Sequence, residues 1–401
     1  MTFLVLAATP GGVEVAAAMN SETGPRIIHV FPYSPRISGG HSNAIRTFIE
    51  CQRAGGLDAV GVAVRSNPAA TEMDFGFPLT EVDSVLNLRW EKLARQLGLA
   101  AGNSLIHFHN VTRAYAPLQR DLQQVGVPFV FTGHGQLSFK NALHGMKKFL
   151  YLQFWDRGPR KADGLQFLTK DTERRANFLL PGYRGARLVQ GNLVTLPELA
   201  SVPIASRLDY EVPSAAFVLL FLGRLDVWIK GLDLLVKAIS CLPPDRFRLV
   251  LAGPDWQRGK ARLEKLAEQY KCRDRISFPG PVYGEKKWSL FKMADAFVSP
   301  SRYEAFNITQ AEAMACGLPV VTSLKVSLAS DLQEANAAIL SPLAARPLAH
   351  AIATLEADPA FRRSLSARGQ AWAAMNCDPK RAGERFRRFY ESILERRAAK
   401  N

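Results

Sequence analysis

The stretch that decides the fold is FVLLFLGRLDVWIKGLDLLVKAI, residues 217–239. Its first six residues, Phe217 to Leu222, are all apolar, which is typical of a parallel strand buried on both faces. Gly223-Arg224 follows as a turn, and from Gly231 to about Cys241 the apolar residues recur at helical spacing. A buried strand, a turn and an amphipathic helix form the repeating unit of parallel α/β proteins.

The same unit recurs on both sides of this stretch. Strand-like runs precede it at 27–31, 58–64, 104–108, 128–132, 164–169 and 186–190, and others follow it at 248–252, 275–278, 296–299 and 319–322. Residues 192–214 are rich in Pro, Ser and Val without a sustained period, which indicates a linker. Since 401 residues exceed one ordinary core, we expect two doubly wound domains with a cleft between them.

We therefore divide the chain into four parts: an N-terminal extension at 1–25, a first Rossmann-like domain at 26–200, a second at 201–375, and a C-terminal segment at 376–401. The first nineteen residues lack a basic start and are broken by Pro10-Gly11-Gly12, so we interpret them as a disordered extension or as residues upstream of a start at Met19. Past Asn376 the sequence predicts a basic amphipathic helix.

The composition narrows the class of protein. An apolar fraction of 47% and a charged fraction of 22% are ordinary for a globular protein, and no apolar run reaches the length of a membrane span. The five cysteines form no CxxC pair, which argues against a zinc site or a disulfide framework and favours the reducing cytoplasm. The net charge of +15 predicts anionic partners: nucleic acid, an acidic lipid surface or phosphate-bearing ligands.

The second domain carries two glutamates at a defined spacing, in SRYEAFNITQAEAMACGLPVVTS at residues 301–323. Glu304 lies in the loop after a predicted strand, and Glu312 lies about two turns along the following helix. The loop residues 305–307, with Ile308 after them, open that helix, so their backbone N–H groups can face a phosphate. One carboxylate can then meet a sugar, and the other can accept hydrogen bonds from vicinal hydroxyls.

Two cations lie on the opposite side of the same expected crevice. Arg224 ends the turn after strand 217–222, and Lys230 follows six residues later. Fixed cations stabilise the negative charge that builds on a departing diphosphate, so the pair can do the work of a metal. No Asp-x-Asp occurs anywhere in the chain, which disfavours a metal-dependent transferase with a single Rossmann domain.

The first domain adds weaker signals. Gly39-Gly40 allows a close backbone approach before a predicted helix, although the pattern is not G-x-G-x-x-G. His134, in the loop after strand 128–132, can donate a hydrogen bond to a sugar hydroxyl or to a main-chain group. We expect His107 to lie in or near the core and His109 to line the cleft.

Together these motifs resemble those of a known enzyme family. Residues 301–323 look like the E-x7-E signature of the retaining family 4 glycosyltransferases, which have the GT-B fold of two facing Rossmann-like domains, and FLGRLDVWIKG resembles their phosphate site. GHGQL, at 133–137, is similar to a PHGML pattern in transferases that build bacterial surface polysaccharides. The sequence departs from the family at Asn307, where Gly is common, and at Gly133 and Gln136.

The resemblance implies roles and partners. Glu304 and His134 would position the donor sugar, Glu312 would bind the ribose, and Arg224 and Lys230 would stabilise the leaving diphosphate. No cofactor or metal is implied: the donor is a UDP-, GDP- or ADP-sugar and the acceptor a glycan or a lipid-diphosphate-linked oligosaccharide. The GT-B resemblance also implies that the C-terminal helix crosses back to the first domain, with Phe386, Phe389, Tyr390 and Leu394 as its apolar face.

The residues from about 141 to 157 have helical spacing, with Leu143, Met146, Leu150 and Phe154 on one side and lysines on the other. We expect Lys147 and Lys148 to dock this helix on an anionic membrane, which would make the enzyme peripheral on the inner face of the plasma membrane.

Other classes remain open. A nucleotide-sugar epimerase or a glycogen-synthase-like transferase would share the fold. A nucleic-acid-binding protein would explain the charge, but the sequence has no helix-turn-helix, zinc finger or RRM-like string.

Overall fold

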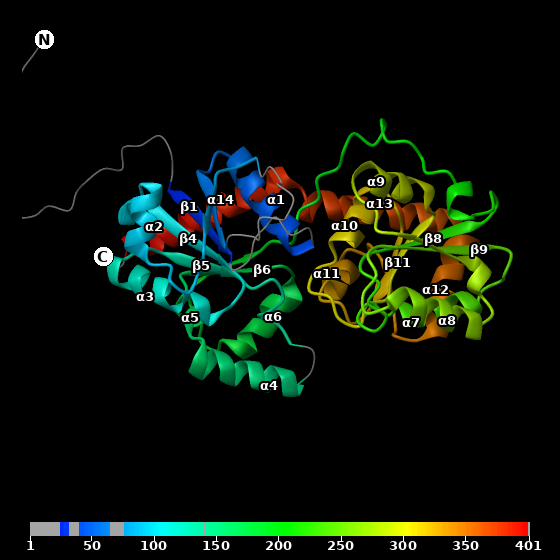
Figure 1. Cartoon of the computed structure of the whole chain (residues 1–401), viewed down its shortest axis with the longest axis horizontal. Coiled ribbons are helices and arrows are strands. Elements are labelled where there is room, and N and C mark those ends of the chain that lie inside the picture. Colours follow the sequence, from blue (N-terminus) through cyan, green and yellow to red (C-terminus); the bar gives the residue numbers. More distant parts are fainter. Residues whose placement is uncertain (1–24, 32–39, 65–75, 140–141, 400–401) are drawn as a thin grey trace, which may run out of the picture.

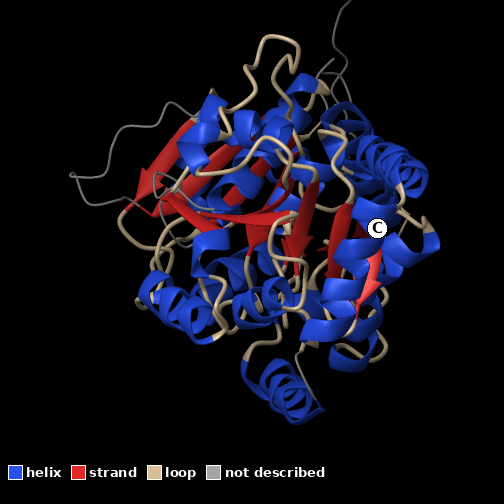
Figure 2. Cartoon of the chain, turned by 90° about the vertical axis from the view of Figure 1, so that its right-hand side faces the viewer, coloured by secondary structure: helices blue, strands red, loops and turns tan. Residues whose placement is uncertain are grey.

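The computed structural model describes residues 25–31, 40–64, 76–139 and 142–399. Two parallel sheets lie side by side, one in each half of the chain (Figure 1). Seen from the second half, strands occupy the middle of the molecule and helices lie on both sides of them (Figure 2). The expected architecture of two α/β domains is confirmed.

Within the described residues the first sheet has seven strands, and every pairing among them is parallel. In spatial order they are β3 (Leu79–Val82), β2 (Ala59–Val64), β1 (Arg26–Phe31), β4 (Ser104–His109), β5 (Phe129–Thr132), β6 (Gly164–Phe167) and β7 (Ala186–Val189). The helices of this half are α1 (Gly40–Ala54), α2 (Trp90–Leu97), α3 (Ala116–Val125), α4 (Ala142–Leu150), α5 (Gly158–Lys161) and α6 (Lys170–Leu179), with short turns η1 (Ala101–Asn103), η2 (Arg113–Tyr115) and the π-helical η3 (Tyr151–Trp155).

The second sheet has six parallel strands. Their order is β10 (Ile276–Gly280), β9 (Phe247–Ala252), β8 (Phe217–Leu222), β11 (Ala296–Ser299), β12 (Val320–Ser323) and β13 (Ile339–Ser341). The helices are α7 (Leu232–Ser240), α8 (Gly259–Gln269), α9 (Gly284–Met293), α10 (Ile308–Ala315), α11 (Ala329–Glu334) and α12 (Ala345–Ala357), with turns η4 (Leu208–Tyr210) and η5 (Arg273–Arg275).

Alternation along the strands assigns side chains to the two faces of each sheet. In β1, Ile28 and Val30 belong to the core cluster shared with α2, α3 and α6, whereas Ile27 and Phe31 belong to the cluster shared with α1. This second cluster continues into the other half of the chain, where it includes Val218 of β8. One continuous apolar core therefore joins the two domains on this side.

Two long helices complete the chain. α13 (Pro359–Asn376) packs against α10, and α14 (Pro379–Ala398) packs against α1 and β7 of the first domain (Figure 1). Asp358 and Asp378 cap these helices with their side chains. Phe386 and Tyr390 are fully buried, so the expected return of the C-terminal helix to the first domain is confirmed.

Candidate active site

A cavity of about 820 Å³ lies between the carboxyl ends of the two sheets. It is lined by α1, by the loop after β5, by the loops after β8 and β11, and by α10. Ten of the residues singled out from the sequence line it: Gly40, His134, Arg224, Lys230, Glu304, Ala305, Phe306, Asn307, Ile308 and Glu312. The eleventh, Gly39, lies outside the described residues. The structure thus brings both pairs of charged side chains to one place.

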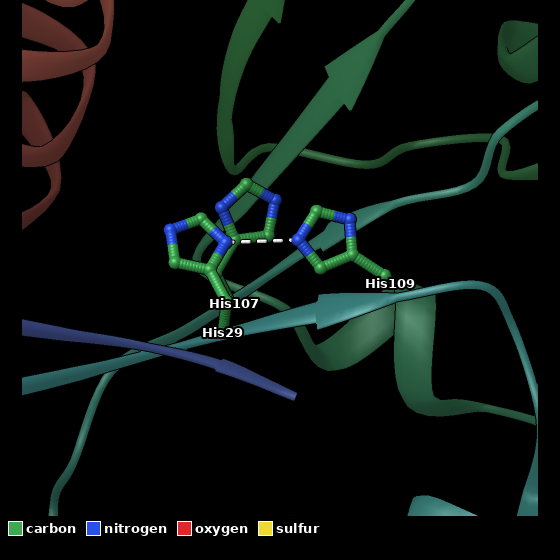
Figure 3. Close-up of side chains that lie close together, drawn as sticks. All are labelled: His29, His107 and His109. Carbon is green, nitrogen blue, oxygen red and sulfur yellow. Dashed lines mark hydrogen bonds between the residues drawn. The ribbon is translucent and has the colours of Figure 1, made fainter. Parts of the chain in front are cut away.

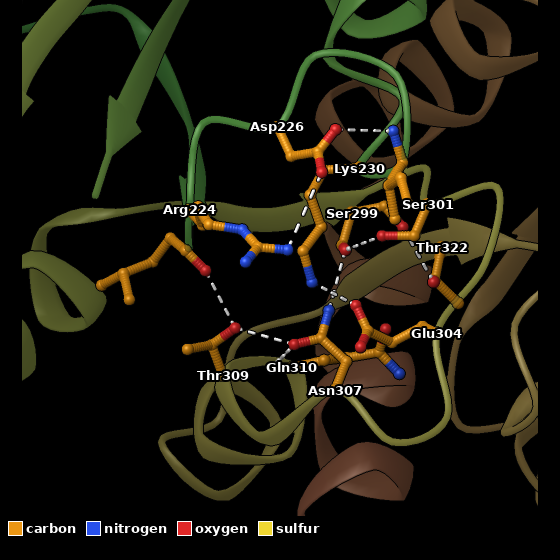
Figure 4. Close-up of polar contacts among 12 residues, drawn as sticks. Arg224, Asp226, Lys230, Ser299, Ser301, Glu304, Asn307, Thr309, Gln310 and Thr322 are labelled. Atoms are coloured by element: carbon orange, nitrogen blue, oxygen red, sulfur yellow. Dashed lines mark hydrogen bonds and ion pairs between the residues drawn. The ribbon is translucent and has the colours of Figure 1, made fainter. Parts of the chain in front are cut away.

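Lys230 and Glu304 form an ion pair at the floor of this cavity (Figure 4). Each side chain is only 18% exposed. The next residue, Gly231, has φ +68°, and a Cβ there would lie 2.0 Å from the carbonyl oxygen of Pro300. The loop that carries Lys230 therefore packs directly on the loop that carries Glu304, and only glycine fits at the crossing.

Arg224 reaches the cavity from the end of β8 and is held from two sides. Its guanidinium lies over the Trp256 ring, 4.2 Å from the centroid, and 3.7 Å from the Asp226 carboxylate. Asp226 also accepts a hydrogen bond from the backbone of Ile229, which ties the loop between Arg224 and Lys230 together. The side chain remains 46% exposed, so the guanidinium is accessible from the cavity.

Asn307 caps α10 at the cavity edge. Its Oδ1 accepts from the backbone N–H of Gln310 at 3.3 Å and from the Thr309 hydroxyl at 2.8 Å, and its Nδ2 donates to Ser299 Oγ at 2.8 Å (Figure 4). Asparagine is among the best N-cap residues. The departure from the family's glycine therefore adds a cap and a link to β11, while the first turn of α10 still opens on the cavity.

Glu312 is paired with a cation that the sequence analysis did not identify. Lys287 of α9 donates to Glu312 Oε1 at 2.8 Å, and both side chains line the cavity. Burial raises the pKa of Glu312, and the Lys287 charge opposes that rise. One carboxylate oxygen is thus committed to Lys287, which leaves Oε2 for a ligand.

The His134 loop of the first domain contacts the Glu304 loop of the second. Tyr303 donates to the carbonyl oxygen of Gly135 at 3.3 Å, and a Cβ on Gly135 would lie 2.6 Å from Cβ of Ala305. Gly135 also has φ +90°, a region that favours glycine. The close approach places the His134 imidazole in the wall of the cavity.

His109 does not line the cavity, contrary to expectation. It is fully buried behind His134, and a hydrogen bond of 2.8 Å joins its Nδ1 to Nε2 of His134. His107 lies in the core, as the sequence indicates, with both ring nitrogens bonded to Tyr390 and Thr132. His134, with His41 of α1 against it, lies between His109 and the cavity, which closes the end of β4 to the cleft.

His29, His107 and His109 form a cluster in which ligand atoms from all three lie within 4.8 Å of one another (Figure 3). Their chemistry fits a hydrogen-bond network better than a metal centre. Nδ1 of His29 and Nε2 of His109 are 2.8 Å apart, closer than two nitrogens that share a metal at about 2.0–2.1 Å in tetrahedral geometry. All six ring nitrogens already have a partner. No lone pair is left to converge on an ion.

Besides Lys287, sequence reasoning missed His41, Trp256 and Trp288. His41 packs edge-on against His134 with ring centroids 4.2 Å apart, and Lys287 lies over the Trp288 ring at 4.0 Å. The contact of His41 with His134 joins α1 to the loop after β5, and Lys287 and Trp288 are neighbours on α9 that reach the cavity only through the packing of that helix. No spacing in the sequence marks either arrangement.

Comparison with known proteins gives a family match in the second half of the chain and structural matches over nearly all of it. Residues 206–372 match the family model described as glycosyl transferases group 1. The chain is 32% identical over 178 residues to the D-inositol 3-phosphate glycosyltransferase of Xylanimonas cellulosilytica, covering 44% of this chain and 42% of the relative. It is 31% identical over 233 residues to the enzyme of the same name from Kineococcus radiotolerans, covering 51% and 53%. The chain thus spans about half the length of these curated relatives.

Solved structures match over nearly the whole chain. Sucrose-phosphate synthase from Thermosynechococcus elongatus gives a TM-score of 0.71 at 21% identity, covering 92% of this chain and 99% of that one. The Anabaena protein HepE in complex with UDP and glucose gives 0.70 at 18% identity, covering 92% and 100%. The chain therefore has the GT-B fold, and its second half carries a glycosyl transferases group 1 domain.

Proposed function

We propose that this protein is a glycosyltransferase that moves a hexose from a nucleotide-sugar to a glycan or lipid-linked acceptor, without a metal and with retention of anomeric configuration. The observation that carries the proposal is the meeting of Arg224 and Lys230 with Glu304 and Glu312 in one interdomain cavity. Retention, and kinship with the family 4 enzymes, rest on the E-x7-E motif at 304–312.

The charges suggest how a donor is held. A diphosphate placed near the N-terminus of α10 would meet Arg224 and Lys230, and the positive end of the helix would add to their field. In the structure Lys230 is paired with Glu304. As a leaving diphosphate gains negative charge, Lys230 can shift toward it and release Glu304 for the sugar hydroxyls.

Ribose would lie deeper, against Glu312. Because Lys287 holds Oε1, the remaining Oε2 can accept hydrogen bonds from vicinal hydroxyls. HepE has been solved in complex with UDP and glucose and with UDP-glucose, which makes UDP-sugars the first donors to test. GDP-sugars and ADP-sugars are the other two donor classes to test.

Thermal unfolding tests donor binding directly. A ligand that binds only the folded state at 100 times its Kd raises the free energy of unfolding by about 2.7 kcal/mol. We expect one class of nucleotide-sugar to stabilise the protein equally with and without EDTA. Product analysis with that donor separates the alternatives, because an epimerase interconverts the donor without any acceptor. Absence of stabilisation by all three classes would contradict the proposal.

An exposed apolar surface on the first domain suggests what kind of acceptor the enzyme uses. The residues on the apolar side of α4 and η3 face outward: Leu143 is 68% exposed, Phe154 64% and Trp155 58%. Met146, Leu150 and Tyr151 continue the same surface. α4 stands at the lower edge of the first domain (Figure 1), away from the second sheet. No helix of the described residues is long and apolar enough to span a membrane, but this one can lie in an interface.

We therefore propose that α4 and η3 dock on an anionic membrane and that the acceptor is a lipid-diphosphate-linked glycan of surface polysaccharide synthesis, at the inner face of the plasma membrane. Aromatic side chains favour the membrane–water boundary, and the exposed Lys147, Arg157 and Arg160 are close to them in the sequence and could meet anionic headgroups. Lys148 instead donates to the carbonyl oxygen of Ser138. The relatives are named for phosphorylated acceptors such as inositol 3-phosphate. A soluble sugar phosphate is accordingly the competing acceptor class.

Vesicle sedimentation tests the docking surface. Phe154→Glu should reduce binding to all vesicles by about tenfold or more, because it removes the burial of a large apolar side chain. Lys147→Glu should reduce binding only to vesicles that contain phosphatidylglycerol, by about fivefold or more per charge lost. Leu208→Glu, at an apolar residue 86% exposed in η4, is the control and should bind normally. Equal binding of the unaltered protein to neutral and anionic vesicles would rule out the electrostatic part.

A further inference from the structure

Five imidazoles form a row that leads from the core of the first domain to the cavity: His107, His29, His109, His134 and His41. Successive ring centroids lie 4.8 Å, 5.1 Å, 5.1 Å and 4.2 Å apart. The row follows from strand geometry. β1 and β4 pair with His29 beside His107, and His109 is two residues further along, so all three lie on one face of the sheet.

Hydrogen bonds join the middle of this row in series. Nε2 of His134 lies 2.8 Å from Nδ1 of His109, and Nε2 of His109 lies 2.8 Å from Nδ1 of His29. Nε2 of His29 lies 2.9 Å from Oε1 of Gln52 on α1. A neutral imidazole has one N–H and one lone pair. Bonds in series between neutral rings must therefore all run in the same direction.

The rings are neutral at physiological pH. Burial lowers the pKa of His29 and of His41 to about 4, and it lowers the pKa values of His107, His109 and His134 well below the ordinary value. A charge on any one of them would also be opposed by its neighbours. The rule of one donor and one acceptor per ring thus applies to the whole row.

A backbone carbonyl fixes the direction at the far end. The Gln166 amide donates to the carbonyl oxygen of Gln190 at 3.0 Å, so its Oε1 is the acceptor for the Thr132 hydroxyl at 2.6 Å. That hydroxyl has a single proton, so its oxygen must accept from Nε2 of His107, 2.6 Å away. Nδ1 of His107 then carries the lone pair and accepts from the Tyr390 hydroxyl at 2.8 Å.

The hydroxyl of Tyr390 also determines which end of the Gln52 amide faces His29. Since the Tyr390 hydroxyl donates its one proton to His107, the phenol oxygen can only accept a hydrogen bond from a second neighbour. The Gln52 side chain interacts with this phenol and counters the rise that burial causes in the pKa of Tyr390. Nε2 of Gln52 is buried and makes no direct hydrogen bond among the described residues, which leaves it available to the phenol oxygen. With the amide nitrogen on the Tyr390 side, Oε1 faces His29 and accepts from it.

We infer that this chain of hydrogen bonds holds His134 as the tautomer with its proton on Nε2, so that the Nδ1 lone pair faces the cavity and accepts a hydrogen bond from a sugar hydroxyl. The last step rests on the proposed function. His109, His29 and Gln52 are positioning residues that act through His134. On this inference His134 accepts from the sugar hydroxyl rather than donating to it, because its N–H points to His109, 2.8 Å away.

Long-range proton–nitrogen NMR on protein labelled with ¹⁵N-histidine reads the tautomer of each ring. Four rings, those of His29, His107, His109 and His134, should carry the proton on Nε2, with signals assigned by single His→Gln variants. A proton on Nδ1 of His134, or an equal mixture of tautomers there, would overturn the inference. This reading needs neither a donor nor an acceptor, so it stands apart from the proposed function.

The variant Gln52→Met removes the acceptor for His29 with little change in side-chain volume. The N–H on His29 Nε2 is then buried without an acceptor. We expect the row to reverse, because a lone pair left there without a donor costs less than an unpaired N–H, and this reversal moves the His134 proton to Nδ1. We expect the KM for the donor sugar to rise about three- to tenfold, the loss of one neutral hydrogen bond, while affinity for the free nucleoside diphosphate is unchanged. His350→Gln, at a histidine outside the row, is the control. An unchanged tautomer in a folded Gln52→Met protein would contradict the coupling.

The two failures can be told apart. If no nucleotide-sugar binds but the four rings carry their protons on Nε2, the hydrogen-bond chain stands and the proposed function fails. If sugar is transferred while His134 carries its proton on Nδ1, the function stands and the inference fails.

Discussion

Replacing Lys230 by Met removes the charge from the centre of the cavity and keeps the apolar stem. Lys230 pairs with Glu304, and both side chains are 18% exposed, so its charge acts in a partly desolvated setting. At an effective dielectric constant of about 20, a unit charge 4 Å from another contributes about 4 kcal/mol. Removing one fixed group that stabilises developing charge typically costs about 2.7–4 kcal/mol. We therefore expect kcat to fall by about 100- to 1,000-fold.

The fold should survive this change. Glu304 loses its partner but faces the solvent of the cavity, so the free energy of unfolding should fall by about 1 kcal/mol, a shift of about 2–4 °C in Tm. Lys237→Met is the matched control: this lysine is on α7, with Nζ 5.6 Å from the Tyr270 ring, and it does not line the cavity. Transfer would be followed by release of the nucleoside diphosphate. Activity of Lys230→Met within about threefold of the unaltered enzyme would refute the role assigned to the charge.

Three further changes test the site. Gly135→Ala should lower the free energy of unfolding by about 1–3 kcal/mol, because φ is +90° and the new Cβ meets Ala305; Gly182→Ala, also at positive φ but in open space, should cost less in the same thermal scans. Asn307→Gly should lower the free energy of unfolding by about 1–2 kcal/mol, because glycine is a fair N-cap but cannot replace the hydrogen bonds to Ser299 and Thr309, and it should retain transfer; a loss above tenfold in kcat would show that the asparagine contacts substrate. Lys287→Met should raise the pKa of Glu312 further, because burial raises it and Lys287 opposes the rise. A carboxyl whose pKa is higher in the folded state loses stability as pH increases, so urea titrations should show the deficit of Lys287→Met growing from pH 5 to pH 7.5; a deficit that shrinks over this range would contradict the assignment.

Much of the fold could be predicted because buried parallel strands leave a simple signal. Runs such as Phe217 to Leu222 are apolar throughout and end at glycine turns, so both the strand and the edge that carries the site are visible in the sequence. β3 was missed for the opposite reason. Leu79–Val82 is a four-residue edge strand with three half-buried residues, and it has no apolar run to reveal it.

The site could be predicted only where its residues belong to one strand–turn–helix unit. Glu304 and Glu312 are tied together by α10, and Arg224 and Lys230 by the loop after β8. Lys287 is on α9 and meets Glu312 only through packing between helices. The alternation in IHFHN predicts that His107 and His109 share a face, but which helix covers that face depends on α14, nearly 300 residues away.

At α4 too, the periodicity of the sequence predicts only part of what the structure shows. Spacing shows that Leu143, Met146, Leu150 and Phe154 share a side, and the structure shows that this side faces outward. An amphipathic pattern gives the separation between apolar and polar faces but not what the apolar face contacts.

The most direct test of the central claim is a crystal structure with the nucleoside diphosphate that gives the largest thermal stabilisation. The diphosphate should lie within hydrogen-bond reach of Arg224 and Lys230 at the N-terminus of α10, with Lys230 drawn away from Glu304 and the ribose hydroxyls on Oε2 of Glu312. A nucleotide bound outside the cavity, or inside it with its phosphates remote from both cations, would contradict the account.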